Sequence, residues 1–258
     1  MSRRHTFGAL IAAFAAVTGI LLWLNWPHDD PSKVVVEDAV RAFREQGPRN
    51  AGLHGGNRPV PGVYRYATRG SESVAADILS TTHAYDGIST ITVSSGSCGD
   101  IERWEVLRER WTETEWCGAP GGTEAWKVTE FHEFFGTEKK DTFKCQGESI
   151  RQPPFENGST RFRNRCESSG SSALGTARLQ GFVTVELNGE EYEAAHIFSQ
   201  SVVEGDTTGT TETEDWRRRS DGLLLRRQVS SDALTNAGGG ARYIESYRIE
   251  LIDPHPQR

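Results

Sequence analysis

The stretch Val183-Thr184-Val185-Glu186-Leu187-Asn188-Gly189 decides the fold class. Its apolar residues alternate with polar ones, which is the pattern of a strand with one buried face. Asn-Gly follows at once, and a second strand-like run continues through residues 191–203. Asn-Gly between two such runs favours a two-residue turn of a primed type, in which both residues take a positive φ. The stretch therefore predicts an antiparallel β-hairpin.

Strand patterns of the same kind extend from Val60 to Pro254. Alternation marks Val63–Thr68 and Tyr243–Leu251, Ile88–Ser95 is rich in β-branched residues, and Asp221-Gly222 predicts a second two-residue turn. No strand–long helix–strand pattern occurs, which excludes the doubly wound and (β/α)8 folds. We therefore predict a mainly β chain, with a curved antiparallel meander that forms a half-barrel or a barrel.

One segment, Ile101–Trp116, fits two patterns. Trp104, Leu107 and Trp111 share a helical face, whereas Thr112, Thr114 and Trp116 favour a strand. We predict one long strand, because Cys98 and Cys117 would then close a bulged hairpin. Its tryptophans are expected in the sheet core.

The N-terminal region predicts a membrane anchor. Thr6–Trp26 is a 21-residue run without charge, of which 16 residues are apolar, and a helix of this length spans about 31 Å. Arg3 and Arg4 precede the run, which places residues 1–5 in the cytoplasm and the rest of the chain outside. We predict a single-pass protein of the plasma (inner) membrane. A cleaved signal peptide, cut after the Ala13-Phe14-Ala15 segment, is the alternative.

Residues 27–59 are predicted to hold a juxtamembrane helix and a linker, and 60–254 an extracytoplasmic β domain. Within Pro31–Gly47, apolar residues fall at i, i+3, i+4 and i+7, which predicts a short amphipathic helix that begins after Ser32. These apolar residues are Val36, Ala39, Val40 and Phe43. Arg49–Pro61 is rich in Gly, Asn and Pro, as a linker would be.

The four cysteines all fall in the predicted exterior region. An even number in an oxidising compartment indicates two disulfides. We favour sequential pairing, Cys98–Cys117 and Cys145–Cys166, since each pair brackets an expected hairpin. The alternative is a four-thiolate metal site, but its ligands usually come in closely spaced pairs.

Charge and motifs narrow the function classes. The 258-residue chain has a net charge of −7, which argues against a nucleic-acid partner. The seven histidines show no metal-ligand spacing, and neither a G-x-S-x-G elbow nor a phosphate-binding loop occurs. Alternating acids at Glu113/Glu115 and Glu212/Glu214/Asp215 are interpreted as solvated strand faces. We therefore expect no catalytic residues, no metal and no cofactor.

A family resemblance rests on Gly205, Gly209-Thr210, Asp215-Trp216 and Gly222-Leu223-Leu224-Leu225-Arg226. Together with an N-terminal anchor, a helix and a long meander, this tail resembles the periplasmic lipoprotein carriers of the LolA, LppX and LprG type. The resemblance implies a half-barrel of antiparallel sheet that holds acyl chains under a helical lid.

Three functions follow as expectations. The first is a non-catalytic ectodomain that acts by contact with a protein of the cell envelope. The second is a carrier or binding module for a lipid or another apolar ligand, and the third is an extracytoplasmic enzyme. For the carrier, the expected lining of the concave face is Tyr64, Tyr66, Val183, Val185, Phe198, Trp216, Tyr247 and Ile249. The competing interpretation packs these residues against a second sheet or the Val34–Phe43 helix.

Overall fold

The computed structural model describes residues 31–47, 58–76, 79–96, 99–117, 124–148, 155, 162–235 and 240–258. Within these ranges, no helix is both long and apolar enough to cross a membrane. The predicted anchor, residues 6–26, lies outside the described residues, as does most of the predicted linker. The anchor and its orientation therefore stay predictions.

The described residues form one helix and thirteen strands, which confirms a mainly β chain. The helix is α2 (Val36–Glu45), and the strands are β1 (Gly62–Ala76), β2 (Leu79–Ala84), β3 (Gly87–Ser95), β4 (Gly99–Leu107), β5 (Arg110–Cys117), β6 (Glu124–Phe134), β7 (Thr137–Gly147), β8 (Phe162–Glu167), β9 (Ser171–Leu187), β10 (Glu190–Gly205), β11 (Thr207–Arg218), β12 (Leu224–Thr235) and β13 (Ala241–Leu251).

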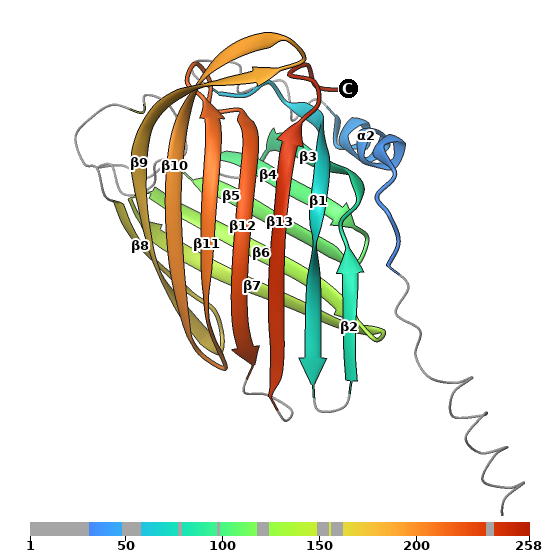
Figure 1. Cartoon of the computed structure of the whole chain (residues 1–258), viewed down its shortest axis with the longest axis vertical. Helices are drawn as coiled ribbons and strands as arrows, with labels where there is room; N and C mark the ends of the chain where they lie inside the picture. Colours follow the sequence, from blue (N-terminus) through green and yellow to red (C-terminus); the bar gives the residue numbers. More distant parts are fainter. Residues whose placement is uncertain are drawn as a thin grey trace, which may run out of the picture.

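The sheet closes on itself. Neighbours along the chain pair in antiparallel fashion, except that β1 lies between β3 and the last strand, β13. The closing ladder runs from Tyr66 opposite Leu251 to Ala76 opposite Ala241. The barrel is flattened, with β9–β13 and β1 on one face and β4–β7 crossing behind them (Figure 1). Of the two predicted shapes, the half-barrel is therefore wrong, and the closed barrel is observed.

Strand β2 continues β3 along the same edge of β1. The registers agree, since Ala76 lies opposite Leu79 and Thr68 lies opposite Gly87. The break between β2 and β3 faces Gly70, whose carbonyl accepts a hydrogen bond from the Tyr85 amide at 2.8 Å. A Cβ on Gly70 would lie 2.2 Å from the Ser246 carbonyl oxygen, so only glycine allows β13 to approach there.

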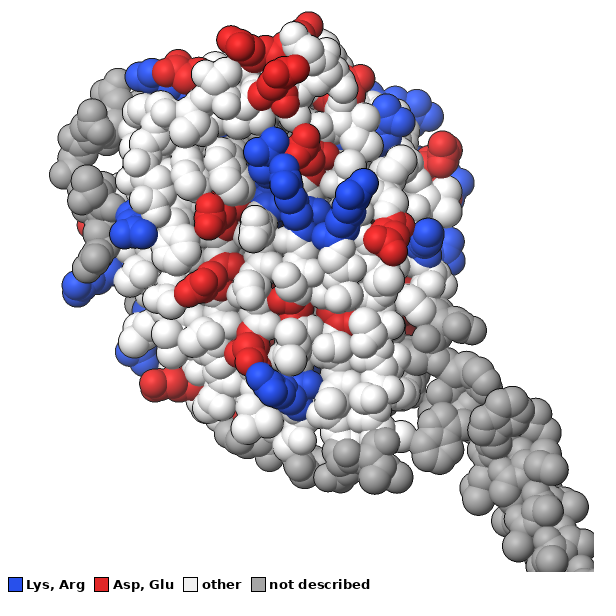
Figure 2. Space-filling view, in the orientation of Figure 1, with Lys and Arg blue, Asp and Glu red and all other residues white. Residues whose placement is uncertain are grey.

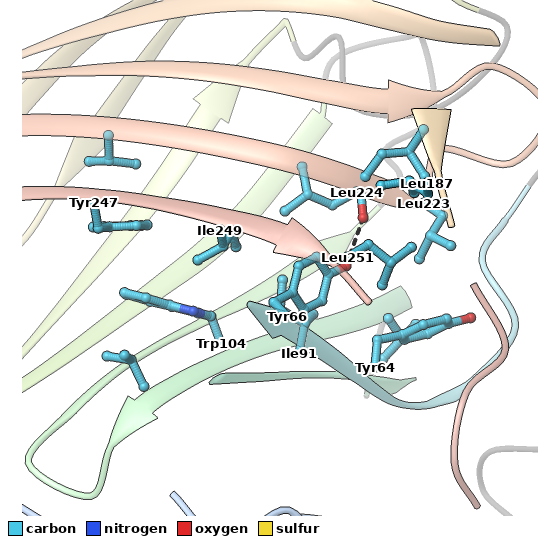
Figure 3. Packing of buried hydrophobic residues seen from close by; sticks show 14 of the residues in the cluster. Tyr64, Tyr66, Ile91, Trp104, Leu187, Leu223, Leu224, Tyr247, Ile249 and Leu251 are labelled. Carbon is cyan, nitrogen blue, oxygen red and sulfur yellow. Dashed lines mark hydrogen bonds between the residues drawn. The ribbon is translucent and has the colours of Figure 1, made fainter. Parts of the chain in front are cut away.

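The main hydrophobic core fills one end of the barrel. Tyr66, from β1, is fully buried there, and its hydroxyl donates to the Leu224 carbonyl at 2.7 Å (Figure 3). The tip of the β9–β10 hairpin bends over this end (Figure 1). Val185 and Leu187 thereby join the same buried cluster. Trp104 and Tyr247 belong to this cluster as well.

Helix α2 packs on the outside of the barrel. Ala39, Val40 and Phe43 bury their side chains against Val63 of β1, which confirms the predicted apolar face. The helix begins at Val36, later than expected, and Val35 at its N-cap makes no side-chain capping bond.

Two of the turns differ from the predictions, and one agrees. Asn188 and Gly189 have φ of 53° and 81°, as expected for a primed turn. Ile101–Trp116 is not one strand, because the chain reverses at Arg108-Glu109 between β4 and β5. The β11–β12 connection is longer than two residues, with the Gly222 amide bonded to the Arg218 carbonyl.

Candidate functional site

The interior of the barrel holds a cavity of about 390 Å³, lined by side chains of β4–β6 and β8–β13. Alternation along each strand decides which residues reach it. On β11, Thr211, Thr213 and Asp215 line the cavity, so the residues between them point outward. Glu212 and Glu214 accordingly lie on the outer face, as predicted for a solvated strand face, whereas Asp215 does not.

A wall of hydroxyl groups covers one side of the cavity. It consists of Ser199 and Ser201 of β10, Thr211 and Thr213 of β11, and Ser231 of β12. Ser201 and Ser231 both lie opposite Thr211, and the Thr211 and Ser231 hydroxyls are 2.9 Å apart. We call this set the hydroxyl wall. Each hydroxyl can donate one hydrogen bond and accept others.

Aromatic rings cover the facing side. Trp104 of β4, Trp116 of β5 and Trp126 of β6 line the cavity, and these strands cross behind β10–β12 (Figure 1). Trp116 and Trp126 stack with their centroids 5.1 Å apart. Trp104 stacks on Tyr247 of β13, at 4.5 Å. The cavity is therefore bounded by hydroxyl groups on one side and by indole rings on the other.

A buried carboxylate organises one end of the interior. Glu72 of β1 is fully buried, and the Nδ1 atoms of His83 and His132 each lie 3.0 Å from its oxygens. The Tyr243 hydroxyl donates to the same carboxylate at 3.1 Å. Burial alone would raise the pKa of Glu72, but these histidine bonds and the charge of Arg110 hold it at about 2.

The ionised Glu72 fixes the orientation of the His132 ring. A carboxylate can only accept hydrogen bonds, so Nδ1 of His132 donates to it. His132 lines the cavity and keeps 15% of its side chain accessible. Glu130, two residues earlier on β6, lines the cavity as well. Glu130 therefore adds a carboxylate acceptor to this end of the cavity.

Arg110 joins Glu72 to a second buried carboxylate. Its Nε atom lies 2.9 Å from an oxygen of Glu245 and 3.8 Å from Glu72. The Tyr85 hydroxyl donates to the same Glu245 oxygen at 2.9 Å. Burial by itself would lower the pKa of Arg110, but the charge of Glu245 outweighs it and raises that pKa. We call Glu72, His132, Arg110 and Glu245 the acidic cluster.

At another level of the cavity, two arginines share one aspartate. Arg227 of β12 binds both oxygens of Asp215, at 2.6 and 2.7 Å. Arg217 of β11 donates from Nε to one of these oxygens at 3.2 Å. All three residues line the cavity. Burial lowers the pKa of Arg217, and the neighbouring charge of Arg227 lowers it further.

Of the eight residues predicted to line a ligand site, the structure places Tyr247 alone on the cavity. Four others, Tyr64, Tyr66, Val185 and Ile249, belong to the packed core at the end of the barrel. These four pack against other strands of the barrel, and their cluster contains no residue of α2.

The remaining three lie away from the cavity. Val183 is 39% exposed, Phe198 lies under the guanidinium of Arg178, at 5.2 Å, and Trp216 stacks on His196 at 4.6 Å. Trp216 and His196 face each other across β10 and β11, on the side opposite to Asp215.

Sequence reasoning missed the arginines, glutamates and hydroxyl residues of the interior. On a strand whose inner face is polar, alternation no longer separates buried from solvated positions, so the sequence does not distinguish Asp215 from the outward-facing Glu212 and Glu214. The sequence does contain one signal of a polar interior: on β11, polar residues occupy both the even and the odd positions, as in Thr213-Glu214-Asp215, so both faces of the strand are polar.

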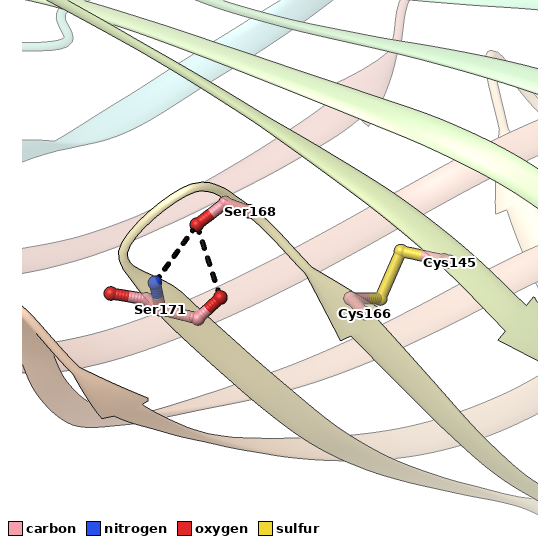
Figure 4. The surroundings of a disulfide bond; sticks show 4 residues. All are labelled: Cys145, Cys166, Ser168 and Ser171. Carbon is pink, nitrogen blue, oxygen red and sulfur yellow. Dashed lines mark hydrogen bonds between the residues drawn. A yellow bond between two sulfur atoms is a disulfide. The ribbon is translucent and has the colours of Figure 1, made fainter.

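One predicted disulfide is observed. Cys145 of β7 and Cys166 of β8 lie directly opposite each other and form a disulfide bond. In the adjacent turn, the Ser168 hydroxyl donates a hydrogen bond to the Ser171 carbonyl and accepts one from the Ser171 amide (Figure 4). The Cys98–Cys117 pairing stays a prediction, because Cys98 lies outside the described residues. Among the side chains that the structure describes, no group of three or more His, Cys, Asp or Glu could hold a metal ion.

Comparison of the chain with protein-family models, curated proteins and solved structures gives no match. The resemblance to the lipoprotein carriers therefore stays a prediction.

Proposed function

We propose that the β domain is a binding module that holds a small hydroxylated ring compound inside the barrel, the chemistry that sugars and nucleosides share. The observation that carries this proposal is the hydroxyl wall facing the indole rings of Trp104, Trp116 and Trp126 across one cavity. The cavity volume of about 390 Å³ falls within the range of small-molecule sites, about 300–1,000 Å³.

The polar lining argues for such a ligand over a lipid. An acyl chain would displace water from the hydroxyl wall without replacing its hydrogen bonds, and each hydroxyl so buried costs roughly 1–3 kcal/mol. Hydroxyl groups of a ligand would instead bond to Ser199, Thr213 and the carboxylate of Glu130. The ring of the ligand would pack against indole surface, where apolar contact is favourable.

The predicted location in the cell envelope is compatible with a binding module. With the predicted anchor at residues 6–26, the binding module would stand at the outer surface of the plasma membrane. Contact with an envelope protein, the first expectation, stays a prediction. On the face shown in Figure 2, acidic and basic side chains are interspersed, and pairs such as Arg226–Glu250 neutralise one another.

The test fills the cavity. The full chain, in a zwitterionic detergent, is titrated with a panel of monosaccharides, disaccharides and nucleosides by calorimetry and by saturation-transfer NMR. Thr213→Trp places an indole in the cavity and should abolish binding of whichever compound the wild type takes. Thr210→Trp, three residues earlier on the outer face of the same strand, is the matched control and should bind normally. Absence of any binder in the panel, or equal binding by both variants, would reject the proposal.

A further inference from the structure

The Arg217–Arg227 pair supplies the basic side chains at one level of the cavity. Asp215 is hydrogen-bonded to both guanidinium groups. Glu102 forms a second ion pair with Arg217, at 3.5 Å, whereas Arg227 is paired with Asp215. The Arg217 and Arg227 side chains keep only 3% and 21% of their surface, so water screens this charge poorly.

Arg227 also has donor capacity to spare. Its Nε and Nη2 atoms are engaged by Asp215, and its Nη1 has no hydrogen-bond partner among the described residues. Each nitrogen of the Arg217 guanidinium has a partner by comparison. Its Nε and Nη2 face Asp215, and its Nη1 donates a hydrogen bond to the Gly222 carbonyl at 3.1 Å. A guanidinium left partly unsatisfied on a cavity wall is suited to a planar anion, which it can bind through two parallel hydrogen bonds.

The two charged ends are separated along the strands. Arg227 lies opposite Ile249 on β13, and Glu245 of the acidic cluster is four residues away on that strand. At ~3.3 Å per residue, about 13 Å separates the two levels. A ligand that spans the cavity would therefore meet guanidinium donors at one end and the carboxylate of Glu130 at the other.

We propose that Arg217 and Arg227 form an anion-binding subsite, and that the ligand of the barrel is an acidic hydroxylated ring compound. Its anionic group lies on Arg227, and its hydroxyl groups point toward the acidic cluster. This inference rests on the proposed function, since it names the ligand class for the same cavity. The anion is a carboxylate, as in a sugar acid, or a phosphate, as in a sugar phosphate; both need the same donors.

The experiment compares four hexose probes of different charge: D-glucuronate, D-glucose 6-phosphate, D-glucose and D-glucosamine. Wild-type full chain should bind one of the two anions roughly ten-fold or more tightly than glucose, and glucosamine more weakly than glucose. The stronger of the two anions identifies the source. Glucose binding as tightly as both anions would overturn the anion subsite while leaving the proposed function standing. No binding by any hexose, together with no binder in the wider panel, would remove the proposed function itself.

Variants then locate the subsite. Arg227→Gln should lose the preference for the anion over glucose, and Arg227→Lys should recover part of that preference. The matched control is Arg226→Gln, which removes an outward arginine paired with Glu250 at 3.1 Å, and should change no affinity by more than about two-fold. If Arg227→Gln fails to fold, the double variant Arg227→Gln/Asp215→Asn keeps the charge balance of the cavity. An anion preference that survives in either folded variant would reject the assignment.

Discussion

Glu72 shows how a single buried residue can set the chemistry of the interior. It is fully buried, and its cost of desolvation is met by two histidines, a tyrosine hydroxyl and the charge of Arg110. Because it stays ionised, it accepts hydrogen bonds from Nδ1 of both imidazole rings and so orients them. The residue therefore acts on the cavity through His132, without lining it.

The lowered pKa of Glu72 predicts acid sensitivity. A carboxyl group whose folded pKa is about 2, against an ordinary 4.5, stabilises the fold fully above about pH 4.5. That contribution, on the order of 3 kcal/mol, is lost as the pH falls toward 2. Glu72→Gln should therefore lower the free energy of unfolding strongly at pH 6 and much less at pH 2.5. Urea unfolding at several pH values measures this difference.

The matched control for Glu72 is Glu250→Gln, which removes an exposed carboxylate of β13. Its ion pairs with Arg226 and Arg248 are partly exposed, so the change should cost at most about 1 kcal/mol. A difference between wild type and Glu72→Gln that stays constant from pH 6 to pH 2.5 would contradict the role assigned to Glu72.

At the scale of elements, the β7–β8 junction is the narrowest place in the described barrel. Only four residue pairs join these strands, from Lys144 opposite Glu167 to Gly147 opposite Asn164. The Cys145–Cys166 disulfide lies within this short ladder. The covalent bond thus reinforces the junction where hydrogen bonding is weakest, and Cys166 also forms part of the cavity wall.

Removing the disulfide should open this junction first. Replacing both cysteines with serine is expected to cost about 3 kcal/mol, since the bond closes a loop of 21 residues. Amide hydrogens of β8 should exchange faster than those of β10 and β11, which hydrogen–deuterium exchange can resolve. Ser168→Ala, which removes hydrogen bonds of the adjacent turn and keeps the disulfide, should cost only about 1 kcal/mol. Uniform exchange across the barrel would speak against a local junction.

The Asn188-Gly189 turn of the β9–β10 hairpin requires a positive φ at both residues. Gly189 has a φ of 81°, which a β-branched residue adopts only with strain of about 1–2 kcal/mol. Gly189→Val should lower the urea midpoint accordingly, because the displaced hairpin tip carries Val185 and Leu187 of the core. Glu191→Val, an exposed position in regular strand geometry two residues later, should leave the midpoint nearly unchanged.

These elements also show what the sequence can and cannot specify. Local signals located the strands, the Asn188-Gly189 turn and the apolar face of α2. The turn at Arg108-Glu109 lacks Gly, Pro or Asn, so it carries no such signal. Closure depends on pairing Tyr66 with Leu251, a contact between distant segments that no local pattern encodes. The cavity followed from closure, and its polar inner face resembles a solvated outer face in sequence.

At the scale of the whole molecule, the predicted anchor and the disulfide both bear on which side of the membrane the closed barrel lies. The C-terminal segment is fastened to the barrel, since Gln257 and Val63 exchange two backbone hydrogen bonds of 2.9 Å. The described β domain therefore ends beside β1, where a fused protein would be on the same side of the membrane as the barrel. The Cys145–Cys166 bond requires an oxidising compartment in most organisms.

The orientation of the chain is predicted from this combination. Arg3 and Arg4 before the charge-free run favour a cytoplasmic N-terminus, so alkaline phosphatase joined after Arg258 through a flexible linker should be active. β-Galactosidase at the same position should be inactive, because it folds only in the cytoplasm. Moving the positive charge, by Arg3→Glu/Arg4→Glu with added lysines after Trp26, should reduce phosphatase activity and leave Cys145 and Cys166 as thiols that alkylating reagents label. Active β-galactosidase in the unaltered chain would reverse the topology. It would also place the disulfide in a reducing compartment, where the bond could not persist.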